Sequence, residues 1–127
     1  MREEEAVLAA MTRTLGPTHK HTLKARINLA VSYHKAGDLD RAAREFEAVV
    51  EARTATLGPR HADTMAAQSN LANIKRLLGD AAGAVALLEV AAPALEAAGH
   101  YNAAGARRKL ELARAALRAA QPEPEPA

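Results

Sequence analysis

Apolar residues recur along this chain at the spacing of amphipathic helices, and short polar turns separate the helical stretches. Between residues 21 and 35, the apolar positions Leu23, Ile27, Ala30 and Tyr33 follow one another at intervals of three or four residues. This spacing places their side chains on one face of a helix. We therefore predict a helix from about residue 21 to residue 35.

Gly37 and Asp38 mark the end of that helix and the start of another. Glycine readily adopts the left-handed conformation found just past helix ends. Aspartate accepts hydrogen bonds from the free amides of a first helical turn. Ala42, Phe46 and Val49 then recur at helical spacing, which predicts a second helix over about residues 39–55. The unit is thus a helix-turn-helix.

The same unit occurs a second time. Residues 15–50 match residues 57–92, 42 positions later, at 13 of 36 positions without a gap. Both stretches contain Leu-Gly-Pro-x-His-x-x-Thr, then Asn-Leu-Ala, then Gly-Asp, so an internal repeat is a better account than chance. The second unit predicts helices over about residues 63–78 and 81–97. Pro93 is expected to kink or shorten the latter.

Both ends of the chain contain parts of the repeat. Residues 3–14 match the second helix alone, with Val7 in the place of Val49, so the chain opens halfway through a unit. Residues 100–117 match 61–78 after a three-residue deletion and predict a last helix that caps the stack. We count about six helices. The predicted organisation is a second helix of a truncated preceding repeat (1–15), two units (16–57 and 58–99), a capping helix (100–120) and a disordered Pro/Glu tail (121–127).

Composition agrees with an all-α fold. Residues that favour helices, above all alanine, dominate, and only 2% of the residues are aromatic. The chain has no cysteine, which excludes disulfides and thiolate metal sites. Its acidic start is unlike a signal peptide, and no apolar run reaches the length of a membrane helix. We therefore expect a cytoplasmic protein without a membrane partner.

The repeated residues resemble the tetratricopeptide repeat. The first unit matches that pattern at Leu29, Ala30, Tyr33, Gly37, Ala42 and Phe46. The second unit departs from it at Lys75 and Leu88, which replace the two aromatic residues. The 42-residue period is similar to the kinesin-light-chain type of this repeat, a type also common in large bacterial regulatory ATPases. The resemblance implies hairpins stacked as a right-handed α-solenoid, whose first helices line a concave face.

The resemblance also implies a non-catalytic scaffold that binds a peptide or protein segment on the concave face. The binding residues carried over from the family are Lys24, Ile27, Asn28, Val31, His34 and Lys35 in unit one, Ser69, Asn70, Asn73, Arg76 and Leu77 in unit two, and Arg108 and Lys109 on the last helix. Asparagine offers a donor and an acceptor to an extended backbone, and the cations attract carboxylates. A purely structural role for the asparagines and a solvated role for the cations remain open.

Charge favours an acidic partner. The net charge is +2, and two of the acids, Glu123 and Glu125, belong to the tail. The mild basic excess of the remainder suits an acidic peptide. It is too small to indicate nucleic acid, for which the chain also has few aromatic residues that could stack on bases.

A second hypothesis makes the chain an intramolecular sensory or oligomerising segment of a larger bacterial regulatory protein. Because the chain opens on half a repeat, Val7, Leu8 and Met11 would expose an apolar face. Self-association through this open N-terminal face is part of that hypothesis.

No residues suggest catalysis. His19 and His61 recur with the turn, 42 residues apart, and are expected to cap turns rather than to hold metal or transfer protons. No nucleophile–base pair, phosphate-binding loop or His-Glu-x-x-His motif is present. We expect no enzymatic activity, no metal site and no cofactor.

Overall fold

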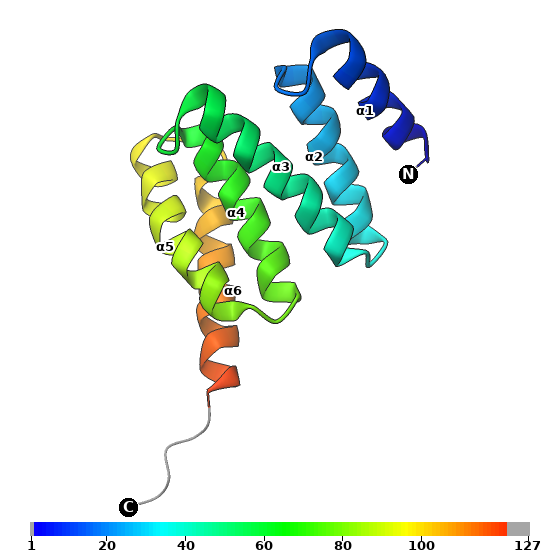
Figure 1. Ribbon diagram of the computed structural model, residues 1–127. Coiled ribbons are helices and arrows are strands. Elements are labelled where there is room, and N and C mark those ends of the chain that lie inside the picture. The colour runs from blue at the N-terminus through cyan, green and yellow to red at the C-terminus, as the bar shows by residue number, and fades with distance from the viewer. Residues whose placement is uncertain (1, 122–127) are drawn as a thin grey trace, which may run out of the picture.

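The computed structural model describes residues 2–121, which form six helices and no strand (Figure 1). The helices are α1 (Arg2–Leu15), α2 (Lys20–Lys35), α3 (Leu39–Leu57), α4 (Ala62–Leu77), α5 (Ala81–Ala97) and α6 (Ala103–Ala120). The predicted all-α class and the six helices are confirmed. The bounds predicted for α2 to α5 lie within two residues of those observed. Apart from Gln121, the predicted tail lies outside the described residues.

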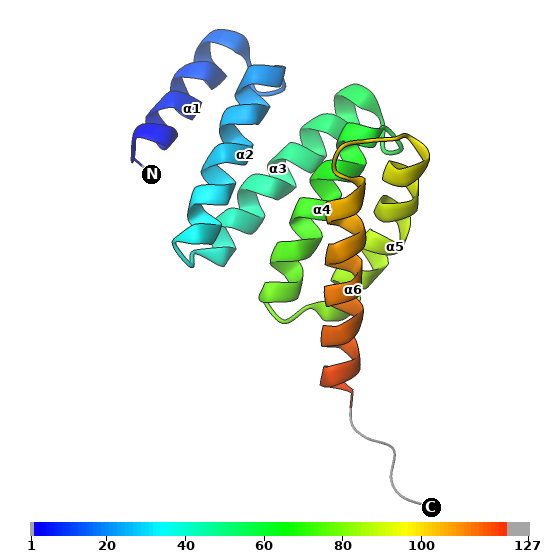
Figure 2. The same cartoon turned by 180° about the vertical axis from the view of Figure 1, so that it is seen from behind.

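The helices form a stack of hairpins. Each helix packs against the next one along the chain, and α6 also packs against α4. The hairpins α2–α3 and α4–α5 lie between a lone α1 at one end and a lone α6 at the other (Figure 1). Figure 2 shows the opposite side, where α6 lies in front of α4 and α5. This arrangement confirms the predicted solenoid of tandem helical hairpins.

The core between the hairpins is built mainly from small and branched side chains. Leu88, Leu95 and Leu110 join α5 and α6 and are at most 1% exposed. Alanines at zero exposure, such as Ala30 and Ala72, lie where the two helices of a hairpin face each other. A methyl side chain lets neighbouring helix backbones approach closely, which is why so few aromatic residues suffice to fill this core.

The short turns within the hairpins follow the prediction. Gly37 and Gly79 adopt positive φ angles of 82° and 98°, a region that side chains other than glycine rarely occupy. Asp38 Oδ1 accepts a hydrogen bond from the amide of Arg41 at 3.2 Å, and Asp80 Oδ1 accepts one from Gly83 at 2.8 Å. Each aspartate therefore caps the second helix of its hairpin.

The longer turns between hairpins explain the repeated histidine and threonine. His19 Nδ1 accepts from the amide of His21 at 3.1 Å, and His61 Nδ1 accepts from the amide of Asp63 at 3.0 Å. Both histidines are N-caps, which confirms the predicted role. The Thr64 hydroxyl is fully buried and donates to the carbonyl of Gly58 at 2.8 Å, so it ties the turn to the helix that follows.

Two local predictions differ from the structure. Helix α5 runs through Pro93 to Ala97 and is not shortened, because Ala92 and Leu95, both fully buried, hold the helix against its neighbours on either side of the proline. A kink at Pro93 stays a prediction. Leu8 was expected to be exposed with Val7, but it is buried in a cluster that α1 shares with α2, α3 and α4. It lies on the side of α1 that faces the following hairpin.

Candidate functional site

The residues predicted to bind a partner lie on α2, α4 and α6, the first helices of the two hairpins and the lone last helix. The exposed ones are Lys24, Asn28, Lys35, Leu77 and Arg108, the partly buried ones are Ile27, Val31, His34, Asn70, Asn73, Arg76 and Lys109, and Ser69 is buried. The predicted binding residues therefore differ in solvent exposure, and all but Ser69 have side chains that solvent can reach.

Four of these residues form two hydrogen-bonded pairs, one within α4 and one between α4 and α6, which together we call the polar cluster: Asn70, Asn73, Arg76 and Lys109. Lys109 Nζ of α6 donates to Asn70 Oδ1 of α4 at 3.0 Å. One helical turn along, Arg76 Nη2 donates to Asn73 Oδ1 at 2.9 Å. Both asparagine oxygens are thus occupied by cations. Their amide nitrogens form no hydrogen bond to another described residue.

The cations of the polar cluster have no anionic partner among residues 2–121. Burial lowers the pKa of Lys109 from its ordinary value of 10.5, because desolvation disfavours the charged form. No carboxylate of these residues lies within 4.0 Å of Lys109 or Arg76. The Nε of Arg76 is buried and has no hydrogen-bond partner there. An incoming anion would therefore meet positive charge that the described part of the chain leaves uncompensated.

Five cations elsewhere in the described chain are paired with a carboxylate. Arg26 binds Glu45 across the first hairpin at 2.7 Å, and Arg107 binds Glu96 at 2.6 Å. The other pairs with a permanent cation are Arg41–Asp38, Lys75–Asp80 and Arg114–Glu89. Among residues 2–121, the other lysines and arginines have no carboxylate within 4.0 Å, and these include Lys24, Lys35 and Arg108 of the predicted set. The polar cluster therefore stands out by the partial burial of the Lys109 side chain and the burial of Arg76 Nε, not by the lack of a carboxylate alone.

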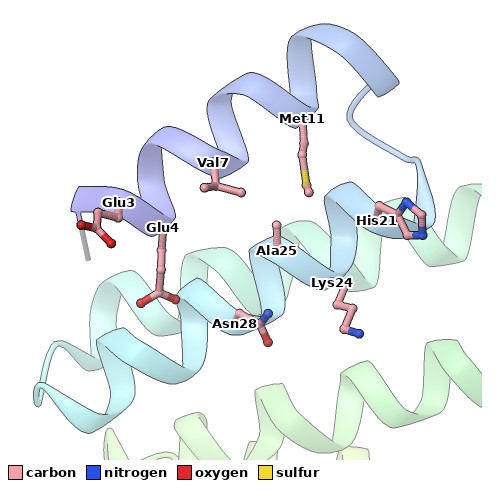
Figure 3. A pocket seen from close by; sticks show the side chains of 8 residues that line it. All are labelled: Glu3, Glu4, Val7, Met11, His21, Lys24, Ala25 and Asn28. Carbon is pink, nitrogen blue, oxygen red and sulfur yellow. The ribbon is translucent and has the colours of Figure 1, made fainter.

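A pocket of about 380 Å³ opens between α1 and α2 and includes Lys24 and Asn28 of the predicted set (Figure 3). We call it the N-terminal pocket. Helix α1 contributes Glu3, Glu4, Val7 and Met11, and α2 contributes His21, Lys24, Ala25 and Asn28. Val7 and Met11 point from α1 toward α2, where Ala25 forms the floor (Figure 3). The pocket is apolar at its centre and charged at both ends.

Comparison with known families identifies the repeat. The family model of the tetratricopeptide repeat matches residues 22–97, which cover both hairpins except for the first two residues of α2. The chain belongs to the tetratricopeptide repeat family. Tetratricopeptide repeats generally mediate protein–protein interactions, and their fold is typically a non-catalytic scaffold.

A solved structure shares the fold of this chain. The crystal structure of BtubC (BKLC) from P. vanneervenii matches with a TM-score of 0.64 at 17% sequence identity. The match covers 98% of this chain and 59% of that chain, so this chain spans about three-fifths of the length of its structural neighbour. At that identity the likeness concerns the fold. No curated protein matches the sequence.

Within this tetratricopeptide array, sequence reasoning missed two features of the face. Ser69 is 1% exposed, and its hydroxyl has no hydrogen-bond partner among the described residues. It is therefore not available to a partner in this structure. The second hypothesis predicted an apolar face at Val7 and Met11, but sequence reasoning missed that this face forms one pocket with Lys24 and Asn28 of the predicted set.

Metal and membrane sites were searched over residues 2–121. No three histidine, aspartate or glutamate side chains there lie close enough to hold a metal ion. None of the described helices is both long enough and apolar enough to cross a lipid bilayer. The chemistry of the face is thus that of hydrogen-bonding amides, cations and a few apolar side chains.

Proposed function

We propose that this protein is a non-catalytic interaction module that binds an acidic, partly apolar peptide in extended conformation across α2, α4 and α6. The proposal takes the general role of the tetratricopeptide family and adds the class of partner. The polar cluster supplies the central contacts. Lys24, Lys35 and Arg108 supply further positive charge, and Ile27, Val31 and Leu77 supply apolar contact.

The observation that carries the proposal is the partial burial of the Lys109 side chain and the burial of Arg76 Nε, with no carboxylate within 4.0 Å of either residue in the described chain. Lys109 loses part of its hydration without a compensating anion, which is reflected in its lowered pKa. A peptide carboxylate in the polar cluster would restore that compensation through charge-assisted hydrogen bonds. A partner with acidic side chains therefore gains more here than at the paired cations of the other surfaces.

The asparagines favour an extended partner. The side-chain amides of Asn70 and Asn73 keep donor hydrogens after their oxygens have accepted from Lys109 and Arg76. Donors one helical turn apart suit the carbonyls of an extended peptide, whose backbone groups are not used internally. Two hairpins and a last helix make a short groove. We therefore expect an affinity in the micromolar range.

Selection from a display library of random twelve-residue peptides tests the proposal. We expect the enriched peptides to be rich in aspartate and glutamate. Fluorescence anisotropy should show their affinity reduced about tenfold or more by Lys109→Ala combined with Arg76→Ala, since both anionic contacts are lost. Arg44→Ala is the matched control, because it removes an exposed cation of α3, a second helix, and should leave the affinity unchanged.

Three outcomes would contradict the proposal. The first is a selection that enriches no peptides, and the second is one that enriches neutral or basic peptides. The third is equal loss of affinity in Arg44→Ala and in the Lys109/Arg76 double variant, because binding would then follow overall charge and not the polar cluster. Circular dichroism of each variant verifies that its helices are intact.

A further inference from the structure

The N-terminal pocket lies where the repeat is incomplete. Val7 on α1 occupies the position of Val49 on α3 and Ala91 on α5, at offsets of 42 and 84 residues. Val49 and Ala91 are fully buried, whereas Val7 is 48% exposed. The later two residues are covered by the first helix of their own hairpin, α2 or α4. Helix α1 has no such partner among the described residues.

Helix α2 likewise lacks a covering helix on the side where it faces the N-terminal pocket. Ala25 is equivalent to Ala67 on α4 and to Ala106 on α6. Both equivalents are fully buried: Ala67 packs with Leu23 and Val49 of the preceding hairpin, and Ala106 lies in the cluster that joins α4, α5 and α6. Helix α6 thus packs on both α4 and α5, and α4 packs on α3. Helix α2 packs on α1 alone, and Ala25 lines the pocket.

We propose that the N-terminal pocket is a docking site for an amphipathic helix with the chemistry of a first helix of this repeat, which takes the place of the first helix of the incomplete repeat. The docked helix lies antiparallel to α1, as α2 lies to α3, and covers Val7, Met11 and Ala25 (Figure 3). This site is distinct from the polar cluster. It recognises a helix, whereas the polar cluster is proposed to recognise an extended peptide.

Charge defines the chemistry of the docked helix. Glu3 is equivalent to Glu45, whose carboxylate binds Arg26 of α2 at 2.7 Å. Glu4 replaces the buried Phe46, and its carboxylate accepts from the Ser32 hydroxyl at 2.6 Å. The α1 end of the pocket is therefore acidic. The docked helix combines a stripe of small or branched apolar residues with an arginine or lysine that faces Glu3.

A second copy of this chain fits the site poorly. Its unpaired first helix is α6, which would have to present the face that α2 and α4 turn toward their own partners. On that face Ala30 and Ala72 are fully buried, but the equivalent residue of α6 is the exposed Glu111. Burying this carboxylate in a hairpin interface without a partner would be costly. The occupant is thus a helix with a small apolar residue at this position, as in α2 and α4, and not α6 of a second copy.

A first helix of the repeat itself is a suitable probe. A fluorescein-labelled synthetic peptide of residues 18–37 contains the apolar stripe and Arg26, and its anisotropy is measured on titration with the 127-residue chain. We expect saturable binding that Val7→Arg weakens about tenfold or more, because an arginine would be buried without an anion. Val90→Arg is the matched control, since Val90 is an exposed valine of α5, 59% accessible and outside the pocket.

A charge exchange tests the predicted contact with Glu3. Glu3→Arg should weaken binding of the unmodified peptide, and a peptide with Arg26→Glu should restore it, because the pair is then reversed. Lys109→Ala should leave peptide binding unchanged, which separates this site from the polar cluster. Failure of the peptide selection against the polar cluster would likewise leave this result untouched.

The proposal is overturned by absence of saturable binding, or by equal effects of Val7→Arg and Val90→Arg. Loss of peptide binding in Lys109→Ala would also overturn it, because the helix would then occupy the polar cluster. Light scattering that detects a dimer abolished by Val7→Arg and unaffected by the peptide would assign the pocket to a second copy instead.

Discussion

Equivalent valines in two repeats should differ sharply in their contribution to stability. Val49 on α3 is fully buried, whereas Val7 on α1 occupies the same repeat position and is 48% exposed. Replacement of either by alanine removes the same atoms from the same kind of helix. Any difference between the two variants therefore reports how well the position is covered by a first helix.

The expected free energies follow from burial. Loss of two methylene equivalents from a buried site costs ~1.6 kcal/mol of transfer free energy, and the cavity left at Val49 adds ~0.5 kcal/mol. The higher helix propensity of alanine returns ~0.5 kcal/mol in both variants. Val49→Ala should thus lower the free energy of unfolding by ~1.6 kcal/mol. For the half-exposed Val7, transfer contributes only ~0.8 kcal/mol, so Val7→Ala should cost ~0.3 kcal/mol.

Urea denaturation followed by circular dichroism at 222 nm measures both values. The midpoints of the two variants can be compared if the slope of the free energy of unfolding with urea concentration is unchanged. A cost for Val7→Ala equal to or above that of Val49→Ala would refute the reasoning. Val7 would then be covered in solution, and the N-terminal pocket would not be vacant.

Three further predictions concern charge and backbone. The affinity for an acidic peptide should fall as pH rises through the pKa of Lys109, which burial places below 10.5. Lys109→Arg should abolish this pH dependence, because a guanidinium stays charged. Peptide titrations in which the unmodified protein and Lys109→Arg lose affinity together would contradict the prediction. The pKa of Tyr33 is raised above its ordinary 10.0 by the hydrogen bond to Glu5, then by burial and the charge of Glu5. The contribution of this bond to stability is therefore present below pH 10 and is lost as pH rises through the raised pKa. Urea midpoints should fall more steeply above pH 10 in the unmodified protein than in Tyr33→Phe, and parallel curves would contradict this. Gly79→Ala should lower the free energy of unfolding by about 1 kcal/mol in urea denaturation, because a side chain is strained at a φ of 98°. No clash adds to this cost, since the new Cβ meets nothing within 4 Å. Gly105→Ala, in open space within α6, should instead stabilise by about 0.5–1 kcal/mol, and a loss in both variants would contradict the conformational explanation.

The repeated motif predicted the fold well because its residues act locally. Gly37 and Asp38 end one helix and begin the next through their own backbone and side chain, and His61 caps α4 two residues away. Such effects depend on short stretches of sequence. Two aligned copies make them visible, and the helix bounds were accordingly predicted to within two residues across both hairpins.

The parts of the face that were not predictable depend on packing between helices. Ser69 and Asn70 are adjacent polar residues of α4, yet the first is buried and the second only partly buried, because the orientation of α4 against its neighbours decides which one faces inward. The partial burial of Lys109 depends likewise on where the shortened turn before α6 places that helix. Pro93 shows the opposite case, in which tertiary contacts override a strong local preference.

The central claim is that the polar cluster receives the acidic side chains of a peptide. The most direct test is a ¹⁵N nuclear magnetic resonance titration of the 127-residue chain with the most enriched acidic peptide. We predict that the largest shifts fall on the side-chain amides of Asn70 and Asn73 and on the backbone of α6 around Lys109. Shifts confined to α3 and α5, the second helices of the hairpins, would contradict the claim.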